Sequence, residues 1–387
     1  MHALPAHDRP LSGITVLDMS QFLSGPVAAL RLADLGARVI KLERPEVGEL
    51  GRQLALCDLR TDRGSISFQA MNRGKESVEV DLKDASDLEF VHSLISEADV
   101  VVQNFRPGVA ERLGVDYATA AQRSPGIIYG TVSGYGSSGP WASKPGQDLL
   151  AQSLSGITRI ARPKGDPQPV PLSLADTLAS IHLSQGIIAL LFRKLRTGVG
   201  GLVETSLVEC LYDVMFETVS NVLHDETILD AESATRAANP YLAAPYGTYA
   251  TRDGFLALAM NDVPQLGALL DVPELDEYRT ASSWWEHREA IGQALSRRLI
   301  QQPTAAWLEI LEAADVWCAP VLSLGESLAS AGTAALELFQ EFDGGLDAPL
   351  RTTRPPIRID GRVLTSPGPA PLLGEHNAIR PTVSHAH

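Results

Sequence analysis

The sequence predicts an α/β protein: a doubly wound, mainly parallel sheet in the first half of the chain, followed by a smaller α+β region. Two observations carry this prediction. Through about the first 200 residues, apolar runs typical of strands alternate with segments in which apolar residues recur at helical spacing. After about residue 225 this alternation stops, and a hairpin pattern and amphipathic helices replace it.

Five strand patterns lie in the first half of the chain. They cover residues 14–18, 38–43, 77–83, 99–105 and 126–136. Helix starts lie between them, because Ser24-Gly25-Pro26 and Pro107-Gly108 are typical of a first helical turn and Asp84 of an N-cap. The third pattern alternates between apolar and polar residues, as a half-exposed edge strand does. In such sheets, ligands bind beside the carboxyl ends of the strands.

The second half of the chain has a different organisation. It contains a largely helical stretch at 204–225, a hairpin at 248–260, amphipathic helices at 284–299 and 304–314, a strand at 316–324, and a Pro-rich extended tail from about 335. We therefore predict a large domain at 1–200, a linker helix at 201–224, a small domain at 225–325, and a C-terminal segment at 326–387 that returns to the large domain.

The composition and net charge limit the classes of protein to which this chain can belong. Of the 387 residues, 44% are apolar and 20% are charged, which predicts a large core. The net charge of −15 argues against non-specific binding to nucleic acid or to an anionic membrane, since both require a basic face. Cys57, Cys210 and Cys318 show no metal-binding spacing, and the N-terminus has no apolar run of signal-peptide length. We expect a cytoplasmic protein with reduced cysteines and no metal.

Asp176 lies where an expected short strand, residues 170–174, meets a long helix that ends at Gly198. A carboxylate at a helix start accepts hydrogen bonds from the first free amides, and the helix dipole favours its ionised form. The simplest interpretation of Asp176 is therefore an N-cap. The apolar stretch 172–192 also contains His182 and Gln185, so we expect a buried helix rather than a membrane span, with His182 packed in the core.

Four basic residues, Arg44, Lys83, Arg106 and Arg112, end or follow the second, third and fourth strand patterns. They should gather at one edge of the sheet, because the carboxyl ends of parallel strands lie together. Each alone is most simply a surface residue. Together, in an acidic protein, they indicate a polyanionic, nucleotide-like ligand. A nicotinamide dinucleotide is not expected, since the first turn lacks the GxGxxG pattern.

Asp148 has two interpretations, because it either caps the helix that follows it or shares a site with Asp176. Other catalytic arrangements have little support. The chain has no GxSxG motif, and no histidine lies between His92 and His182, so a Ser-His-Asp triad is not indicated. No cluster of residues has metal-ligand spacing.

Taken together, these motifs resemble a family III CoA-transferase of the CaiB/BaiF family. That group includes formyl-CoA:oxalate and carnitine CoA-transferases and the related α-methylacyl-CoA racemases. The matching stretches run almost end to end and include LSGITVLDMS, SGPVAALRLADLGARVIKLERP, ADVVVQNFRPGVAERLGVDY, PGQDLLAQSLSGI, SLADTLASIHLSQGIIALLFRKLRTG and APLLGEHN. The resemblance implies an interlocked homodimer. Each chain would have a Rossmann-like large domain, made of N- and C-terminal parts, and a smaller middle domain.

The resemblance also implies a function and a site. Asp176 would be the nucleophile that carries CoA as an aspartyl-CoA thioester while CoA passes from an acyl-CoA to a small carboxylic acid, possibly a dicarboxylic one. Gln147 and Asp148 would be its catalytic neighbours, and we expect amides at the helix start and the Gln147 side chain to stabilise the oxyanion. The residues implied to bind coenzyme A are Leu23, Ser24, Arg44, Val80, Asp81, Leu82, Lys83, Asn104, Phe105, Arg106, Arg112, Pro145 and Gly146.

Two alternatives remain open at this point. The racemase branch reads Gly-His-Asp where this chain reads Gly146-Gln147-Asp148, and a glutamine cannot act as the proton-transfer base, so the departure favours a transferase. A CoA-binding homologue without turnover is the other alternative, and the intact Asp176 argues against it. The oxalate-specific enzymes carry a glycine-run loop that residues 237–251 lack. This puts formyl and oxalate in doubt as substrates and leaves small dicarboxylates such as succinate open.

Overall fold

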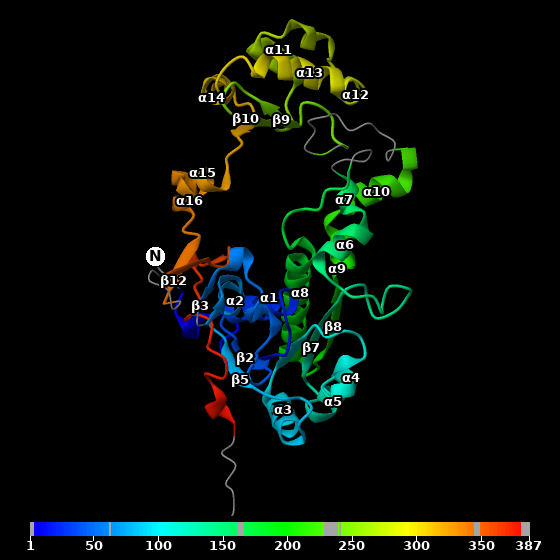
Figure 1. Cartoon of the computed structure of the whole chain (residues 1–387). Coiled ribbons are helices and arrows are strands. Elements are labelled where there is room, and N and C mark those ends of the chain that lie inside the picture. Colours follow the sequence, from blue (N-terminus) through cyan, green and yellow to red (C-terminus); the bar gives the residue numbers. More distant parts are fainter. Residues whose placement is uncertain are drawn as a thin grey trace, which may run out of the picture. The chain divides into compact units, whose positions relative to one another are not determined.

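The computed structural model describes residues 4–61, 63–160, 166–227, 239, 241–343 and 349–380. The chain forms two compact units (Figure 1). The large unit comprises Met1–Ser155, Pro171–Val214 and Leu336–His387, and the small unit comprises Gly156–Val170 and Met215–Ala335.

A six-stranded parallel sheet forms the centre of the large unit, which confirms the doubly wound α/β prediction. Its strand order is β5-β2-β1-β6-β7-β8. The strands are β1 Thr15–Asp18, β2 Arg38–Glu43, β5 Glu76–Glu79, β6 Val100–Gln103, β7 Ile128–Ser133 and β8 Gly201–Ser206. In the register, Leu17 lies opposite Ile40 on one side and Val101 on the other. The chain runs outward in opposite directions from β1 and β6, so the switch point at which such folds bind ligands lies between these two strands.

Helices pack on this sheet and bury a core that includes Ile40, Val78, Ile95 and Val101. They are α1 Ser24–Asp34, α2 Ile66–Asn72, α3 Ala85–Glu97, α4 Val109–Leu113, α5 Tyr117–Arg123, α6 Asp148–Ser155, α8 Leu174–Thr197 and α9 Leu207–Val214. Local chemistry sets several of their ends. The Asp84 carboxylate accepts from the amides of Ser86 and Asp87 and begins α3.

The structure corrects two elements. Residues 201–206 form strand β8 at the edge of the sheet rather than the start of a linker helix. Helix follows only in α9 and in α10 Phe216–His224. Residues 170–174 do not form a strand. Helix α8 begins at Leu174 with Ser173 at the N-cap position, which places Asp176 inside the first turn rather than at the cap.

Helix α8 is long and apolar enough to cross a membrane by length and composition alone. In the structure it packs against α1, β7, β8 and α9. Leu183 and Ile187 reach the backbone of β7, where a Cβ on Gly130 would lie 2.9 Å from Ile187 and 3.1 Å from Leu183. This close approach fixes the depth of the helix on the sheet. His182 is not in the core, because it is partly exposed and its Nε2 lies 3.2 Å from Asp213 Oδ2.

The small unit is built around an antiparallel sheet of β9 Gly247–Ala250, β10 Phe255–Leu258 and β11 Cys318–Pro320. Its core surrounds Trp307, whose indole N–H donates to the carbonyl of Leu299 at 2.7 Å. Its helices are α7 Ile157–Ile160, α10 Phe216–His224, α11 Val263–Leu270, α12 Ala281–Glu286, α13 Arg288–Leu299, α14 Thr304–Ala313, α15 Leu324–Ala329 and α16 Ala331–Ala335. The helix predicted at 284–299 is thus two helices that meet at His287.

The C-terminal segment belongs to the large unit. It contains the paired strands β12 Phe339–Phe342 and β13 Leu350–Thr353 and the hairpin of β14 Arg358–Ile359 with β15 Arg362–Val363. The tail then runs beside β5, as Figure 1 shows in red. The His376 amide donates to the carbonyl of Ser77 at 2.9 Å, and the Glu79 amide donates to Asn377 Oδ1 at 2.8 Å. These bonds cover an otherwise open sheet edge.

Candidate functional site

Asn104 joins the two loops at the switch point of the sheet. Its side-chain amide donates to the carbonyl of Gln21 at 2.7 Å, and its carbonyl oxygen accepts from the Gln21 amide at 2.8 Å. The same amide donates to Ser24 Oγ at 3.3 Å. Asn104 therefore ties the loop after β6 to the turn after β1, and Ser24 begins α1 at this point.

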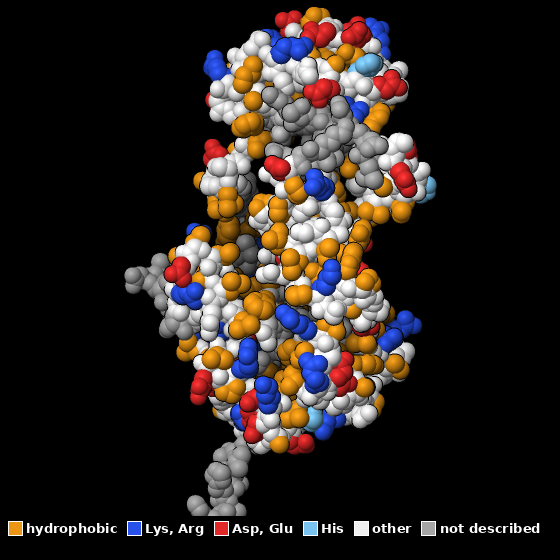
Figure 2. Space-filling view, turned by 45° about the vertical axis from the view of Figure 1, so that its right-hand side comes forward, with side chains coloured by type: hydrophobic (Ala, Val, Ile, Leu, Met, Phe, Trp, Pro, Cys, Tyr) orange, Lys and Arg blue, Asp and Glu red, His pale blue; other side chains and the backbone are white. Residues whose placement is uncertain are grey.

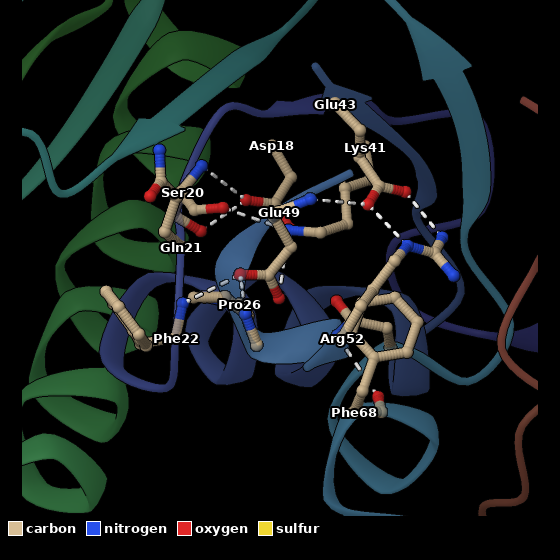
Figure 3. Close-up of polar contacts among 12 residues, drawn as sticks. Asp18, Ser20, Gln21, Phe22, Pro26, Lys41, Glu43, Glu49, Arg52 and Phe68 are labelled. Carbon is tan, nitrogen blue, oxygen red and sulfur yellow. Dashed lines mark hydrogen bonds and ion pairs between the residues drawn. The ribbon is translucent and has the colours of Figure 1, made fainter. Parts of the chain in front are cut away.

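That turn has an unusual backbone, which a buried carboxylate supports. Phe22 has a φ of 62°, a left-handed conformation that costs a non-glycine residue free energy. Its amide donates to Glu49 Oε2 at 3.0 Å. Figure 3 shows the Glu49 carboxylate between Phe22 on one side and Asp18 and Lys41 on the other. A structural carboxylate thus holds the turn in place.

Glu49 belongs to a set of three anions and three cations, all buried except the partly buried Arg52. We call this set the buried ion network, and it consists of Asp18, Glu43, Glu49, Lys41, Arg52 and Lys75. Lys75 Nζ lies 2.8 Å from Asp18 Oδ2, and Lys41 Nζ lies 3.6 Å from the same oxygen. Burial alone would raise the pKa of Asp18, but the two lysines outweigh it and lower that pKa to about 2. Burial lowers the pKa of Lys75 to about 8, although Asp18 opposes the shift.

Asp176, Asp148 and Ser24 come together from the first turns of α8, α6 and α1. The Asp176 amide donates to Asp148 Oδ1 at 3.1 Å. Burial, followed by the charge of Asp148, raises the pKa of Asp176 to about 6, while a hydrogen bond from Ser24 acts in the opposite direction. No cation among the described residues lies within 4.0 Å of either carboxylate. The site therefore holds two adjacent carboxylates without a compensating charge.

Contacts made by residues just before and just after Asp148 in the sequence fix its position. Before it, Gly134 and Gly146 pack backbone against backbone, since a Cβ on Gly146 would lie 2.6 Å from the Cα of Gly134. This contact returns the long loop after β7 to the end of that strand. After it, Gln152 Nε2 donates to Asp148 Oδ2 at 2.7 Å. Gln147 itself is exposed.

The first turn of α8 has few amides available for a ligand. The Leu174 amide donates to the carbonyl of Leu172 at 2.8 Å, and the Asp176 amide is engaged by Asp148. The expectation that the amides of this helix start stabilise an oxyanion therefore does not hold for these two groups.

The four predicted cations are all exposed, and none has a carboxylate within 4.0 Å among the described residues. The topology places Arg44 after β2, Lys83 in the loop after β5, and Arg106 after β6, with Arg112 on α4. Figure 2 shows Lys and Arg side chains gathered on part of the surface of the large unit. In an acidic chain, unpaired cations near the carboxyl ends of parallel strands are available to bind an anion.

The other predicted CoA contacts differ in how much side chain they expose. Val80 is buried, and Leu82 and Phe105 pack against the core of the large unit, so a ligand would meet mainly their backbone. Asp81 and Pro145 are exposed. Leu23 is partly exposed and directly precedes Ser24.

Two residues that support this site, Glu49 and Gln152, were not predicted from the sequence. Gln152 follows Asp148 by four residues on one helix, a spacing that brings two side chains together, so it could have been found. Glu49 reaches Phe22 across the fold, and no local pattern signals that contact. No group of three or more His, Cys, Asp or Glu in the described part of the chain could hold a metal ion.

Comparison with known proteins gives consistent matches over almost the whole chain. Residues 11–377 match the sequence model of the family described as CoA-transferase family III. The chain is 32% identical to the acetyl-CoA:oxalate CoA-transferase of Acetobacter aceti, over 95% of this chain and 94% of that protein. It is 30% identical to the succinyl-CoA:glutarate CoA-transferase of Mus musculus, over 95% of this chain and 85% of that protein. The crystal structure of Rv3272 from Mycobacterium tuberculosis matches with a TM-score of 0.83 at 28% identity, over 96% of this chain and 98% of that one.

Proposed function

The chain belongs to CoA-transferase family III and is an enzyme that transfers CoA between carboxylic acids, and from this premise we propose how its own residues do so. The observation that carries the proposal is the position of Asp176. This partly buried carboxylate lies in the first turn of α8, beside Ser24 of the switch-point turn, and the unpaired cations lie at the strand ends of the same unit.

In the proposed route, Asp176 is a covalent nucleophile. A carboxylate oxygen of Asp176 attacks the thioester carbonyl of the donor acyl-CoA, the C–S bond breaks, and the CoA thiolate leaves a mixed anhydride behind. The thiolate then attacks the Asp176 carbonyl carbon, which releases the donor acid and forms an aspartyl-CoA thioester. The acceptor carboxylate repeats both steps in reverse order and leaves as a new acyl-CoA, with Asp176 regenerated. No proton is gained or lost.

The surroundings of Asp176 suit this role. Burial and the Asp148 charge raise the pKa of the Asp176 carboxyl to about 6, so it is ionised at neutral pH but is more basic than an ordinary aspartate. A destabilised carboxylate gains more on forming a neutral anhydride or thioester. Gln147 lies directly before Asp148 and is exposed, so its amide can donate to the oxyanion.

Coenzyme A provides the polyanion that the cations require. Arg44, Lys83, Arg106 and Arg112 are free to pair with its phosphates, since none pairs with a carboxylate among the described residues. Asn104 and Ser24 would hold the segment of CoA that crosses the switch point.

For the acceptor we propose a small dicarboxylic acid. The relatives include enzymes named for oxalate, glutarate and mesaconate, each of which is a dicarboxylate. Part of the loop at 237–251 that bears on this choice lies outside the described residues.

We also propose a homodimer, in the interlocked form that the family resemblance implies. Helix α8 buries Leu183 and Ile187 but leaves Ile181, Phe192 and Leu195 45%, 62% and 82% exposed. An exposed apolar face of this kind on one long helix is typical of an interaction surface. Light scattering coupled to size-exclusion chromatography should give the mass of two chains.

The test of the reaction is a matrix of acyl-CoA donors against carboxylic acids, followed by mass spectrometry. The wild-type enzyme should form new acyl-CoA esters and, with hydroxylamine, a trapped derivative of Asp176. Asp176→Asn should show neither, whereas Asp213→Asn, which changes an exposed aspartate on α9, should remain active. Transferase turnover by Asp176→Asn, or α-proton exchange without any CoA transfer, would contradict the proposal.

A further inference from the structure

We infer that Gln152 is a positioning residue for the proposed reaction, because it fixes the orientation of the Asp148 carboxylate against the helix start that carries Asp176. The inference rests on the proposed function and adds a residue to it. Gln152 is 1% exposed and lies one turn after Asp148 on α6. Its Nε2 donates to Asp148 Oδ2 at 2.7 Å and to the carbonyl of Leu172 at 3.2 Å.

These bonds divide the two oxygens of Asp148 between two partners. One oxygen accepts from Gln152, and the other accepts from the Asp176 amide at 3.1 Å. Gln152 thereby connects α6 both to the segment before α8, through Leu172, and to the first turn of α8, through Asp148. A carboxylate with both oxygens engaged cannot rotate without losing a hydrogen bond, so the backbone of the nucleophile is held in place.

The choice of an uncharged donor also matters. The Gln152 amide orients the Asp148 carboxylate through a hydrogen bond but brings no positive charge with it, so the negative charge of Asp148 stays beside Asp176. A lysine or arginine at this position would cancel that charge. The buried ion network compensates each of its carboxylates with a cation, and Gln152 instead keeps Asp148 both fixed and negative.

Several other charged residues near α8 are paired with another charged residue or with a neighbouring hydroxyl. Arg31 and Asp34 of α1 lie 3.7 Å apart, Glu209 of α9 accepts from Ser206, and Asp213 of α9 lies 3.2 Å from His182. Glu204 of β8 is exposed. Asp148 is the charge that acts on Asp176, and the Ser24 hydroxyl opposes it.

Gln152→Met tests the inference, because methionine keeps the length and volume of the side chain and removes the donor. We expect kcat to fall about tenfold, the KM for acyl-CoA to stay within twofold, and the acid limb of the pH profile to move. Ser153→Ala is the matched control on the same helix, since its exposed hydroxyl bonds only to the carbonyl of Leu149 among the described residues. It should behave as wild type.

A double-mutant cycle separates positioning from general damage to the fold. In an Asp148→Asn background, Gln152→Met should cost much less than it does in the wild type, because the orientation that it fixes is already lost. Equal losses in both backgrounds, or a wild-type kcat and pH profile for Gln152→Met, would overturn the inference.

If Gln152→Met does not fold, Gln152→Glu serves instead. It places a carboxylate against Asp148 at high pH and a protonated donor there at low pH, so its kcat relative to wild type should rise as the pH falls. A pH-independent ratio would overturn the inference. Activity of Asp176→Asn bears on the proposed function alone, so the two failures are distinguishable.

Discussion

The buried ion network and the site around Asp176 lie in the same unit, but the carboxylates of the network are paired with cations and those of the site are not. In the network, Asp18, Glu43 and Glu49 each have a cation within 4.0 Å. At the site, Asp148 and Asp176 lie together without a cation, and the cations at the strand ends lie without a carboxylate, among the described residues. Compensated charge holds the switch-point turn, and the uncompensated charges are the groups that we propose for ligand binding and for reaction.

The largest effect on stability is expected within the network. Lys75→Met removes the cation 2.8 Å from the fully buried Asp18, so the free energy of unfolding should fall by about 3 kcal/mol. Urea unfolding at pH 7 measures this change. A stability equal to that of the wild type would show that the network is not a compensated unit.

The strand-end cations should show the reverse behaviour. Arg106→Gln should raise the KM for acyl-CoA about tenfold, because a charge-assisted contact with a phosphate is lost, and should leave the melting temperature unchanged. Arg38→Gln is the matched control. Arg38 is the first residue of β2, so it lies at the amino ends of the strands, away from Arg106, and its charge is already paired with Glu76 at 2.7 Å. If both variants have the same KM, the edge does not bind CoA.

A smaller effect on stability is expected at Asp176. Its pKa of about 6 in the folded protein exceeds the ordinary value of 3.8, so the folded state binds the proton more tightly and loses stability as the pH rises from 4 to 6. Asp176→Asn removes this cost. It should therefore stabilise the fold at pH 8 by about 1 kcal/mol, after allowance for solvent screening, and have no effect below pH 4. Thermal unfolding at the two pH values measures the difference, and stabilisation of equal size at both would contradict it.

The smallest expected effect is a shift of the pH profile. Asp148→Asn removes the neighbouring charge but not the burial, so the acid limb of kcat/KM should move below pH 6 and remain above pH 4. If the acid limb of the kcat/KM profile stays at the same pH, Asp148 does not act on Asp176 through its charge.

Most of the sheet, and the positions of the candidate site residues at strand ends and helix starts, could be predicted from the sequence, because hydrophobic periodicity and strand-end position are local signals. Strand β8 was missed, since GLVETS follows directly after a long helix and two glycines and lacks an apolar run. Asp176 was expected at the cap, although the spacing Ser173-Leu174-Ala175-Asp176 is typical of a helix that begins one position after the serine.

The rest could not be predicted, because it depends on contacts between distant parts of the chain. Lys41 and Lys75 look like ordinary surface lysines in the sequence, yet both are buried against Asp18. Glu49 supports Phe22 only after β1 and β2 have paired. Local patterns placed the charged residues on strands and helices. Which of them are paired with an opposite charge depends on tertiary contacts.

The tail beside β5 has a consequence for the order in which this protein is made. The last segment of the chain supplies the bonds to Ser77 and Glu79, from residues almost 300 positions away. The small unit is complete at Ala335, before that segment has been synthesised. During synthesis, the edge of β5 therefore stays unpaired until the C-terminal segment has been made, after the whole small unit. The large unit, although its first strands are synthesised first, completes its folding late.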